Sequence, residues 1–329
     1  MTAQPQSAAA DVEDAVLGRH AGQREELLVA APAGSPRRDR GRSGARTRLG
    51  GPVDVLRSPA RHRRPSLWLT RAASSGSSLG VLSEIYTPDN LLDRLSDPAT
   101  LAEQYERGKR RERELLDRNL GLGGGDALSV GCGWHPGRHL LPRPAWRLVA
   151  SDIDGDRTRI AVSQGDADEG VVGAAGMLDM LPDASFDVVL HRLVLHHVAY
   201  NGPLEPAIAE AARLLRPGGA FVAIEPSVYH PIGVALAVAN RAGLGIRVHG
   251  TRDDIPLSPR RVVKAARAAG LQPQLHAVSY SWRRLPVRAQ RAIGALDRFG
   301  SAPGARWLGH TFMLIARPAG VRRTPQASR

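Results

Sequence analysis

Cysteine is almost absent from this chain, since Cys132 is the only one among 329 residues. A single cysteine excludes an intrachain disulfide and any zinc site built from several cysteines. We therefore expect a reducing compartment and a cytoplasmic location. Uninterrupted apolar runs of about eighteen residues are also missing, so the sequence predicts no membrane span.

Lysine is nearly missing too. Of the 45 basic residues only Lys109 and Lys264 are lysines, and the rest are arginines. The formal net charge is +13, of which residues 1–80 carry +6 and residues 317–329 carry +4. No strong basic field is left on the central part, and the sequence contains no nucleic-acid reader motif. We expect no nucleic-acid partner.

Hydrophobic periodicity is scarce in residues 1–80, which are rich in Ala, Arg, Gly, Pro and Ser. Such a composition cannot offset its ordering entropy by burial, so we expect a disordered tail. Residues 81–318 have ample length for one folded domain with a sizeable core. Residues 319–329 are expected to form a second, basic disordered tail. The sequence does not indicate an oligomeric state.

The most informative segment is the apolar run 128–130 followed by Gly131-Cys132-Gly133. A glycine pair after a buried strand allows a sharp turn and a close approach by a ligand. The next apolar run ends at Asp152, where an acid lies beside the loop and can accept hydrogen bonds from ribose hydroxyls. This pattern predicts a nucleoside-containing cofactor. It does not fit the dinucleotide fingerprint, because Pro136 stands where that fingerprint needs its third glycine.

Strand-like and helix-like segments alternate along the chain, which is typical of a doubly wound parallel sheet in an α/β fold. A charged amphipathic helix is expected near 98–119, ahead of the first strand of the domain. The expected strands lie near 126–131, 147–152, 170–174, 186–191, 219–225, 274–280 and 309–316. The expected helices that follow lie near 136–141, 156–164, 204–215, 259–269 and 287–298, with a short one after the fourth strand.

Five motifs occur in a fixed order: the Val-Gly-Cys-Gly loop, Asp152, Pro-Asp-Ala-Ser-Phe-Asp at 182–187, Leu-His-His at 195–197, and Leu-Leu-Arg-Pro-Gly-Gly at 214–219. In this order the chain resembles the class I S-adenosylmethionine-dependent methyltransferases, in particular the type 11 or ubiquinone and menaquinone biosynthesis group. The resemblance implies a Rossmann-like sheet of seven strands with an antiparallel last strand. It also implies S-adenosylmethionine as the cofactor and methyl transfer to a small molecule as the activity.

The resemblance also implies which residues bind the cofactor. They are Gly131, Cys132, Gly133, Gly137, Asp152, Ile153, Met177, Leu178 and His191. Two departures stand against this. Ser129 and Ala175 occupy positions where the family usually has acids. The alternative is therefore a catalytically inactive protein of this fold that serves as a binding or regulatory partner.

His197 is the preferred catalytic residue, because similar methyltransferases have a histidine at this place and an imidazole suits proton transfer near neutrality. The alternative is that His196 and His197 only cap or pack the short helix. His135 and His139 are spaced like a metal pair but lack a third ligand in sequence, so we expect no metal.

The connections 226–256 and 282–306 are longer than the fold requires, and we assign them to the substrate pocket. Tyr229 and His230 are the expected substrate residues, with a polar loop under a lid as the alternative. The apolar stretch 231–242 suggests an apolar or lipid-like acceptor.

Overall fold

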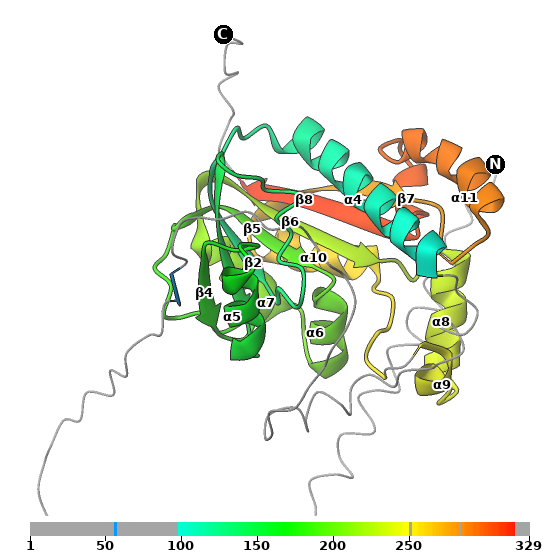
Figure 1. Cartoon of the computed structure of the whole chain (residues 1–329), viewed down its shortest axis with the longest axis horizontal. Coiled ribbons are helices and arrows are strands. Elements are labelled where there is room, and N and C mark those ends of the chain that lie inside the picture. Colours follow the sequence, from blue (N-terminus) through cyan, green and yellow to red (C-terminus); the bar gives the residue numbers. More distant parts are fainter. Residues whose placement is uncertain (1–55, 58–97, 250–251, 283, 320–329) are drawn as a thin grey trace, which may run out of the picture. The chain divides into compact units, whose positions relative to one another are not determined.

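A central sheet organises the chain, with helices on both faces (Figure 1). The computed structural model describes residues 56–57, 98–249, 252–282 and 284–319. The strand order is β1-β4-β3-β2-β5-β6-β8-β7. The strands are β1 (Leu56–Arg57), β2 (Gly125–Val130), β3 (Trp146–Asp152), β4 (Glu169–Val172), β5 (Phe186–Arg192), β6 (Leu215–Pro226), β7 (Leu271–Ser279) and β8 (Thr311–Pro318).

Strands β2 to β6 run parallel to one another, and β8 lies antiparallel between β6 and β7. This confirms the α/β sheet with an antiparallel last strand. The seven expected strands correspond to β2–β8. β1 adds a two-residue antiparallel pair at the edge of β4 and falls inside the range 1–80. The rest of the two expected tails lies outside the described residues, apart from Ala319.

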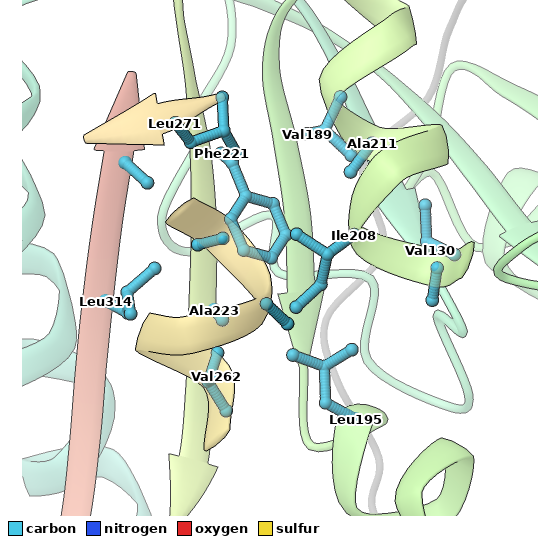
Figure 2. Packing of buried hydrophobic residues seen from close by; sticks show 14 of the residues in the cluster. Val130, Val189, Leu195, Ile208, Ala211, Phe221, Ala223, Val262, Leu271 and Leu314 are labelled. Carbon is cyan, nitrogen blue, oxygen red and sulfur yellow. The ribbon is translucent and has the colours of Figure 1, made fainter. Parts of the chain in front are cut away.

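Helices α4 (Pro98–Leu120) and α5 (Gly155–Ser163) cover one face, and α7 (Glu205–Leu214) and α10 (Pro259–Ala268) cover the other. The alternation of side chains along each strand supplies apolar groups to both layers. Under α7 and α10, Phe221 of β6 packs among Ile208 and Val262 (Figure 2). Under α4, Leu115 and Leu116 are buried against the opposite face of the same strands.

The helix expected near 136–141 is absent, and this prediction was wrong. Gly137 has φ +83°, which interrupts a right-handed helix, and Pro142 and Pro144 follow at once. Short turns replace the helix. They still place Leu140 and Leu141 in the core beside α4, so the apolar residues were identified correctly although their backbone was not.

The two long connections contain their own helices. The first includes α8 (Pro231–Arg241) and α9 (Gly245–His249), and the second includes α11 (Val287–Gly294), η2 (Ala295–Phe299) and η3 (Ala305–Trp307). A short helix, α6 (Leu195–Asn201), follows β5 as expected. Within the described residues, no helix combines the length and apolar character that crossing a bilayer would require.

Candidate functional site

The glycine loop lies at the carboxyl end of β2, beside the end of β3. Asp152 is 5% exposed, and its carboxylate accepts the backbone N–H of Gly133 at 2.8 Å and that of Asp154 at 3.0 Å. Asp152 therefore holds the loop in shape. Each carboxylate oxygen keeps a second acceptor position that a ribose hydroxyl could use.

Gly133 supplies the open part of this loop. Its φ is +50°, and a Cβ at this position would meet only the Nη1 atom of Arg157, at 3.8 Å. Large apolar side chains stand exposed next to it: Ile153 after β3 is 75% exposed, and Met177 after β4 is 68% exposed. An open glycine, an acid and exposed apolar side chains at one sheet edge fit the ribose and adenine of the expected cofactor.

Four other expected cofactor residues are buried: Cys132, Gly137, Leu178 and His191. The side chain of Cys132 is buried, and burial together with the charge of Asp152 raises the pKa of its thiol to about 12. A Cβ on Gly137 would meet Leu190 at 2.6 Å, so this glycine serves close packing against β5. Leu178 is fully buried, and its N–H donates to Glu210 at 3.0 Å.

The side chain of His191 is fully buried and packs edge-on against Phe221, with ring centroids 5.3 Å apart. Neither ring nitrogen has a partner among the described residues, and burial lowers the pKa of this histidine to about 3. The ring is therefore neutral and lies beneath the sheet edge. The contact of His191 with the cofactor stays a prediction.

A cavity of about 440 Å³ opens among α4, α6, the end of β6 and the two long connections. Pro226, Leu236 and Pro256 line it from the first connection, and Trp282 and Asp297 line it from the second. This volume is in the range of small-molecule sites. Only Leu236 of the apolar stretch 231–242 belongs to its wall, while Val234 and Val238 of α8 are exposed to solvent.

His197 lies on the wall of this cavity at the start of α6. Its Nδ1 atom is 2.8 Å from Oδ2 of Asp253. Burial alone would raise the pKa of Asp253, but the hydrogen bond with His197 and the neighbouring imidazoles hold it below its ordinary value. The carboxylate is thus charged and keeps a proton on Nδ1. Nε2 has no bonding partner in the part of the chain that the structure describes.

His196 has a different environment, although its ring lies only 4.1 Å from that of His197. It is buried between Glu225, 2.6 Å from Nδ1, and Asp254, 3.3 Å from Nε2. Burial alone would lower the pKa of His196, but the charge of Glu225 and the hydrogen bonds with both acids raise it to about 10. His196 is therefore an imidazolium at neutral pH and cannot accept a proton.

Glu225 also accepts the N–H groups of Val194 and Leu195, at 2.9 and 2.7 Å. It therefore fixes the start of α6, which carries both histidines. Just before this helix, Leu193 has φ +57°, a left-handed conformation that is rare for a leucine. Such strain persists where the surrounding structure holds a residue firmly, and Leu193 lines the cavity.

A buried ion pair joins α4 to the end of β5. Arg192 and Glu112 are 6% and 8% exposed, and Nε of the arginine is 2.8 Å from the carboxylate. Glu112 also bonds to Nε2 of His139 at 3.0 Å. Burial opposes the charge of Glu112, but Arg192 and His139 outweigh it and lower its pKa. His139 thus supports the Glu112–Arg192 ion pair. His135 instead packs near Tyr105, with ring centroids 5.7 Å apart.

Neither of the two expected substrate residues lines the cavity. The Tyr229 hydroxyl lies 3.1 Å from that of Ser258, which begins α10 without a side-chain capping bond. His230 begins α8: its Nδ1 accepts the N–H of Ile232 at 3.2 Å, and its Nε2 bonds to the carbonyl of Tyr280 at 3.1 Å. His310, which packs edge-on against His230, lines the cavity instead.

Sequence reasoning missed Asp253, Asp254 and Glu112. The sequence does offer one signal, because the pair Asp253-Asp254 matches the pair His196-His197. The two pairs are more than fifty residues apart in the chain, and nothing in the sequence shows that they meet. In the described ranges, no group of three or more His, Cys, Asp or Glu side chains is arranged to hold a metal ion.

Comparisons with known proteins agree with this geometry. Residues 128–223 match the family model described as a methyltransferase domain. Over 120 residues the chain is 30% identical to a probable S-adenosylmethionine-dependent methyltransferase of Mycolicibacterium smegmatis, a stretch that covers 36% of this chain and 45% of that protein. The chain thus spans less than half of this relative.

Solved structures with a similar backbone are also known. One is a S-adenosylmethionine-dependent methyltransferase from Thermotoga maritima, with 15% identity, coverage of 66% and 95% of the two chains, and a TM-score of 0.47. Another is a geranyl diphosphate methyltransferase in complex with S-adenosylmethionine, with 17% identity, coverage of 71% and 97%, and a TM-score of 0.45. Residues 128–223 therefore match a methyltransferase domain, and their motifs resemble those of the class I S-adenosylmethionine-dependent methyltransferases.

Proposed function

We propose that this protein transfers the methyl group of S-adenosylmethionine to a small-molecule acceptor in the cavity, with His197 as general base. The observation that carries the proposal is the hydrogen bond between Asp253 and His197, whose side chain lies on the cavity wall. An imidazole held in one tautomer by a carboxylate presents a basic nitrogen to the substrate. The histidine next to it, His196, is already protonated and is not suited to this role.

The cofactor, when bound, supplies an electrophilic methyl group on a sulfonium. Gly133, Asp152 and Ile153 would hold its nucleoside part at the sheet edge. Nε2 of His197 would accept the proton that an O–H or N–H group of the acceptor loses on methylation. Asp253 stabilises the imidazolium that results, as carboxylates do in other general-base pairs.

Positioning is the second contribution of the chain. Methyl transfer is an in-line displacement, so holding the nucleophile in line accounts for a large part of the rate. Helix α6 is fixed by Glu225, and α4 is fixed by the Glu112–Arg192 pair. These contacts support a rigid wall around the cavity. The lipid-like acceptor stays a prediction, because Leu236 alone of the apolar stretch 231–242 lines the cavity.

The first experiment is calorimetric binding of S-adenosylmethionine, S-adenosylhomocysteine and NAD to the wild type and to Asp152→Ala. We expect micromolar binding of the first two, no binding of NAD, and loss of binding in the variant. Absence of binding by a folded protein would favour the inactive alternative. An acceptor screen that detects S-adenosylhomocysteine release then tests His197→Ala, for which we expect a loss of turnover of about a hundredfold or more with cofactor affinity retained.

A further inference from the structure

Resting on the proposed function, we propose that the acceptor carries a carboxylate and that Arg107 and Arg111 of α4 bind it. Both arginines lie one helical turn apart and line the cavity. Residues four apart share one face of a helix, so the two guanidinium groups can act on a single anion. Arginine is the side chain best suited to bind a carboxylate with two parallel hydrogen bonds.

Arg111 has a donor left over. Its side chain is 16% exposed; Nη2 donates to the carbonyl oxygen of Asp297, and Nη1 lies 3.3 Å from Glu114. Its Nε is buried and has no partner among the described residues. A buried donor without an acceptor is destabilising. An acidic ligand in the cavity would supply the missing acceptor.

Two other charged groups of the cavity are paired with acids, and Arg284 adds a further arginine to the lining. Arg192 is neutralised by Glu112, and His196 by Glu225 and Asp254. These pairs leave the end of the cavity between α4 and the α11–η2 segment. Helices α4 and α11 lie near each other (Figure 1), and Nη2 of Arg111 donates to the carbonyl oxygen of Asp297. Arg107 and Arg111 supply the positive charge at this end of the cavity.

Asp297 is the acid that faces this end. It is buried, accepts the N–H of Tyr280 at 2.9 Å, and lies near the hydroxyl of Ser279. Burial raises the pKa of Asp297 despite these contacts and the nearby charges of Arg111 and Arg107. Glu114 also pairs with Arg111, but it is 55% exposed and its charge is screened by solvent. The buried carboxyl group of Asp297, whose pKa is raised, does not by itself balance two guanidinium groups. The positive charge that remains fits one carboxylate.

His197 lines the same cavity. An acceptor that contacts both His197 and the two arginines would present its nucleophilic atom to His197 and its carboxylate to α4. Ser281 adds a hydroxyl to the wall whose oxygen is buried and has no partner within the described ranges. The acceptor class is therefore an acid with an O–H or N–H group placed away from its carboxylate.

The test uses the full-length protein saturated with S-adenosylhomocysteine and matched pairs of ligands. Hydroxy and amino carboxylic acids, aliphatic and aromatic, are titrated beside their primary amides, and the ratio of acid to amide affinity is measured by calorimetry. We expect acids to bind at least about tenfold more tightly than amides, because hydrogen bonds between two charged groups are stronger than those in which one partner is neutral. Arg107→Gln and Arg111→Gln should bring the ratio close to one.

Arg110→Gln is the matched control, because Arg110 lies on the same helix and is exposed. It should leave the ratio unchanged. Equal affinity for acids and amides, no binding of any acid, or an equal loss in the Arg110 variant would overturn the proposal. If Arg111→Gln does not fold, Arg107→Gln decides. Failure of the proposed function would give a different result, namely no binding of S-adenosylhomocysteine. In that case the acids are titrated against the protein alone.

Discussion

His196 and Glu225 form a buried ion pair, with 2.6 Å between Nδ1 and Oε2, and the pKa of the imidazole is raised from 6.5 to about 10. A raised pKa in the folded state contributes stability that is complete below the unfolded value and is lost as the pH rises through the folded value. We therefore expect the free energy of unfolding to fall between about pH 6.5 and 10.

His196→Gln tests this expectation. Removing the cation leaves Glu225 buried without its partner, which should cost about 3 kcal/mol or more at pH 7. The stability difference between wild type and variant, measured by denaturant unfolding, should shrink as the pH approaches 10. A difference that does not vary with pH would show that His196 is not charged in the folded protein.

Asp253→Asn should lower turnover by about tenfold or more, because an amide does not hold the proton on Nδ1 of His197 as a carboxylate does. Cofactor affinity should stay near the wild-type value. Asp183→Asn provides the control, since Asp183 is 76% exposed and pairs with Arg213. Equal turnover rates in Asp253→Asn and Asp183→Asn would show that Asp253 has no role in methyl transfer.

The two loop glycines should respond differently to alanine. A Cβ on Gly131 would lie 2.2 Å from Val194, so Gly131→Ala should destabilise the fold by about 2 kcal/mol or more. A Cβ on Gly133 would contact only Nη1 of Arg157, at 3.8 Å, so Gly133→Ala should cost only the strain of a left-handed alanine, about 1–2 kcal/mol, and should weaken S-adenosylmethionine binding. Thermal unfolding and calorimetry separate the two effects, and retained affinity in Gly133→Ala would contradict the assigned cofactor position.

Glu112→Gln should be strongly destabilising, because it leaves Arg192 buried without a counter-charge. The expected loss is about 3–5 kcal/mol by denaturant unfolding. Glu114→Gln on the same helix is the control, since Glu114 is 55% exposed and should change stability little. Similar losses of unfolding free energy in both variants would show that the Glu112–Arg192 pair contributes no more to stability than an exposed pair.

Removal of residues 1–55 should leave helical content and cofactor binding unchanged, as their composition predicts. The shortened chain keeps Leu56–Arg57, which pair with β4. Circular dichroism and calorimetry check this prediction. Loss of either property would make the removed residues part of the domain.

The sequence alone determined the strand order along the chain, the glycine loop, Asp152 and the position of His197. These features are local: each depends on a short apolar run, a turn residue or a motif that the chain displays within a few residues. The wrong prediction of a helix at 136–141 also has a local cause. Gly137 and the prolines after it favour turns, and the alternation of segments suggested a helix that these backbone preferences do not allow.

Only the tertiary structure decided which of the two adjacent histidines is available for chemistry. His196 and His197 are neighbours in sequence, yet one is buried between two acids and the other faces the cavity beside Asp253. The pairing of Arg192 with Glu112, eighty residues apart, was equally hidden. Burial and long-range charge set the pKa of a side chain, and both depend on segments that meet only when the chain has folded.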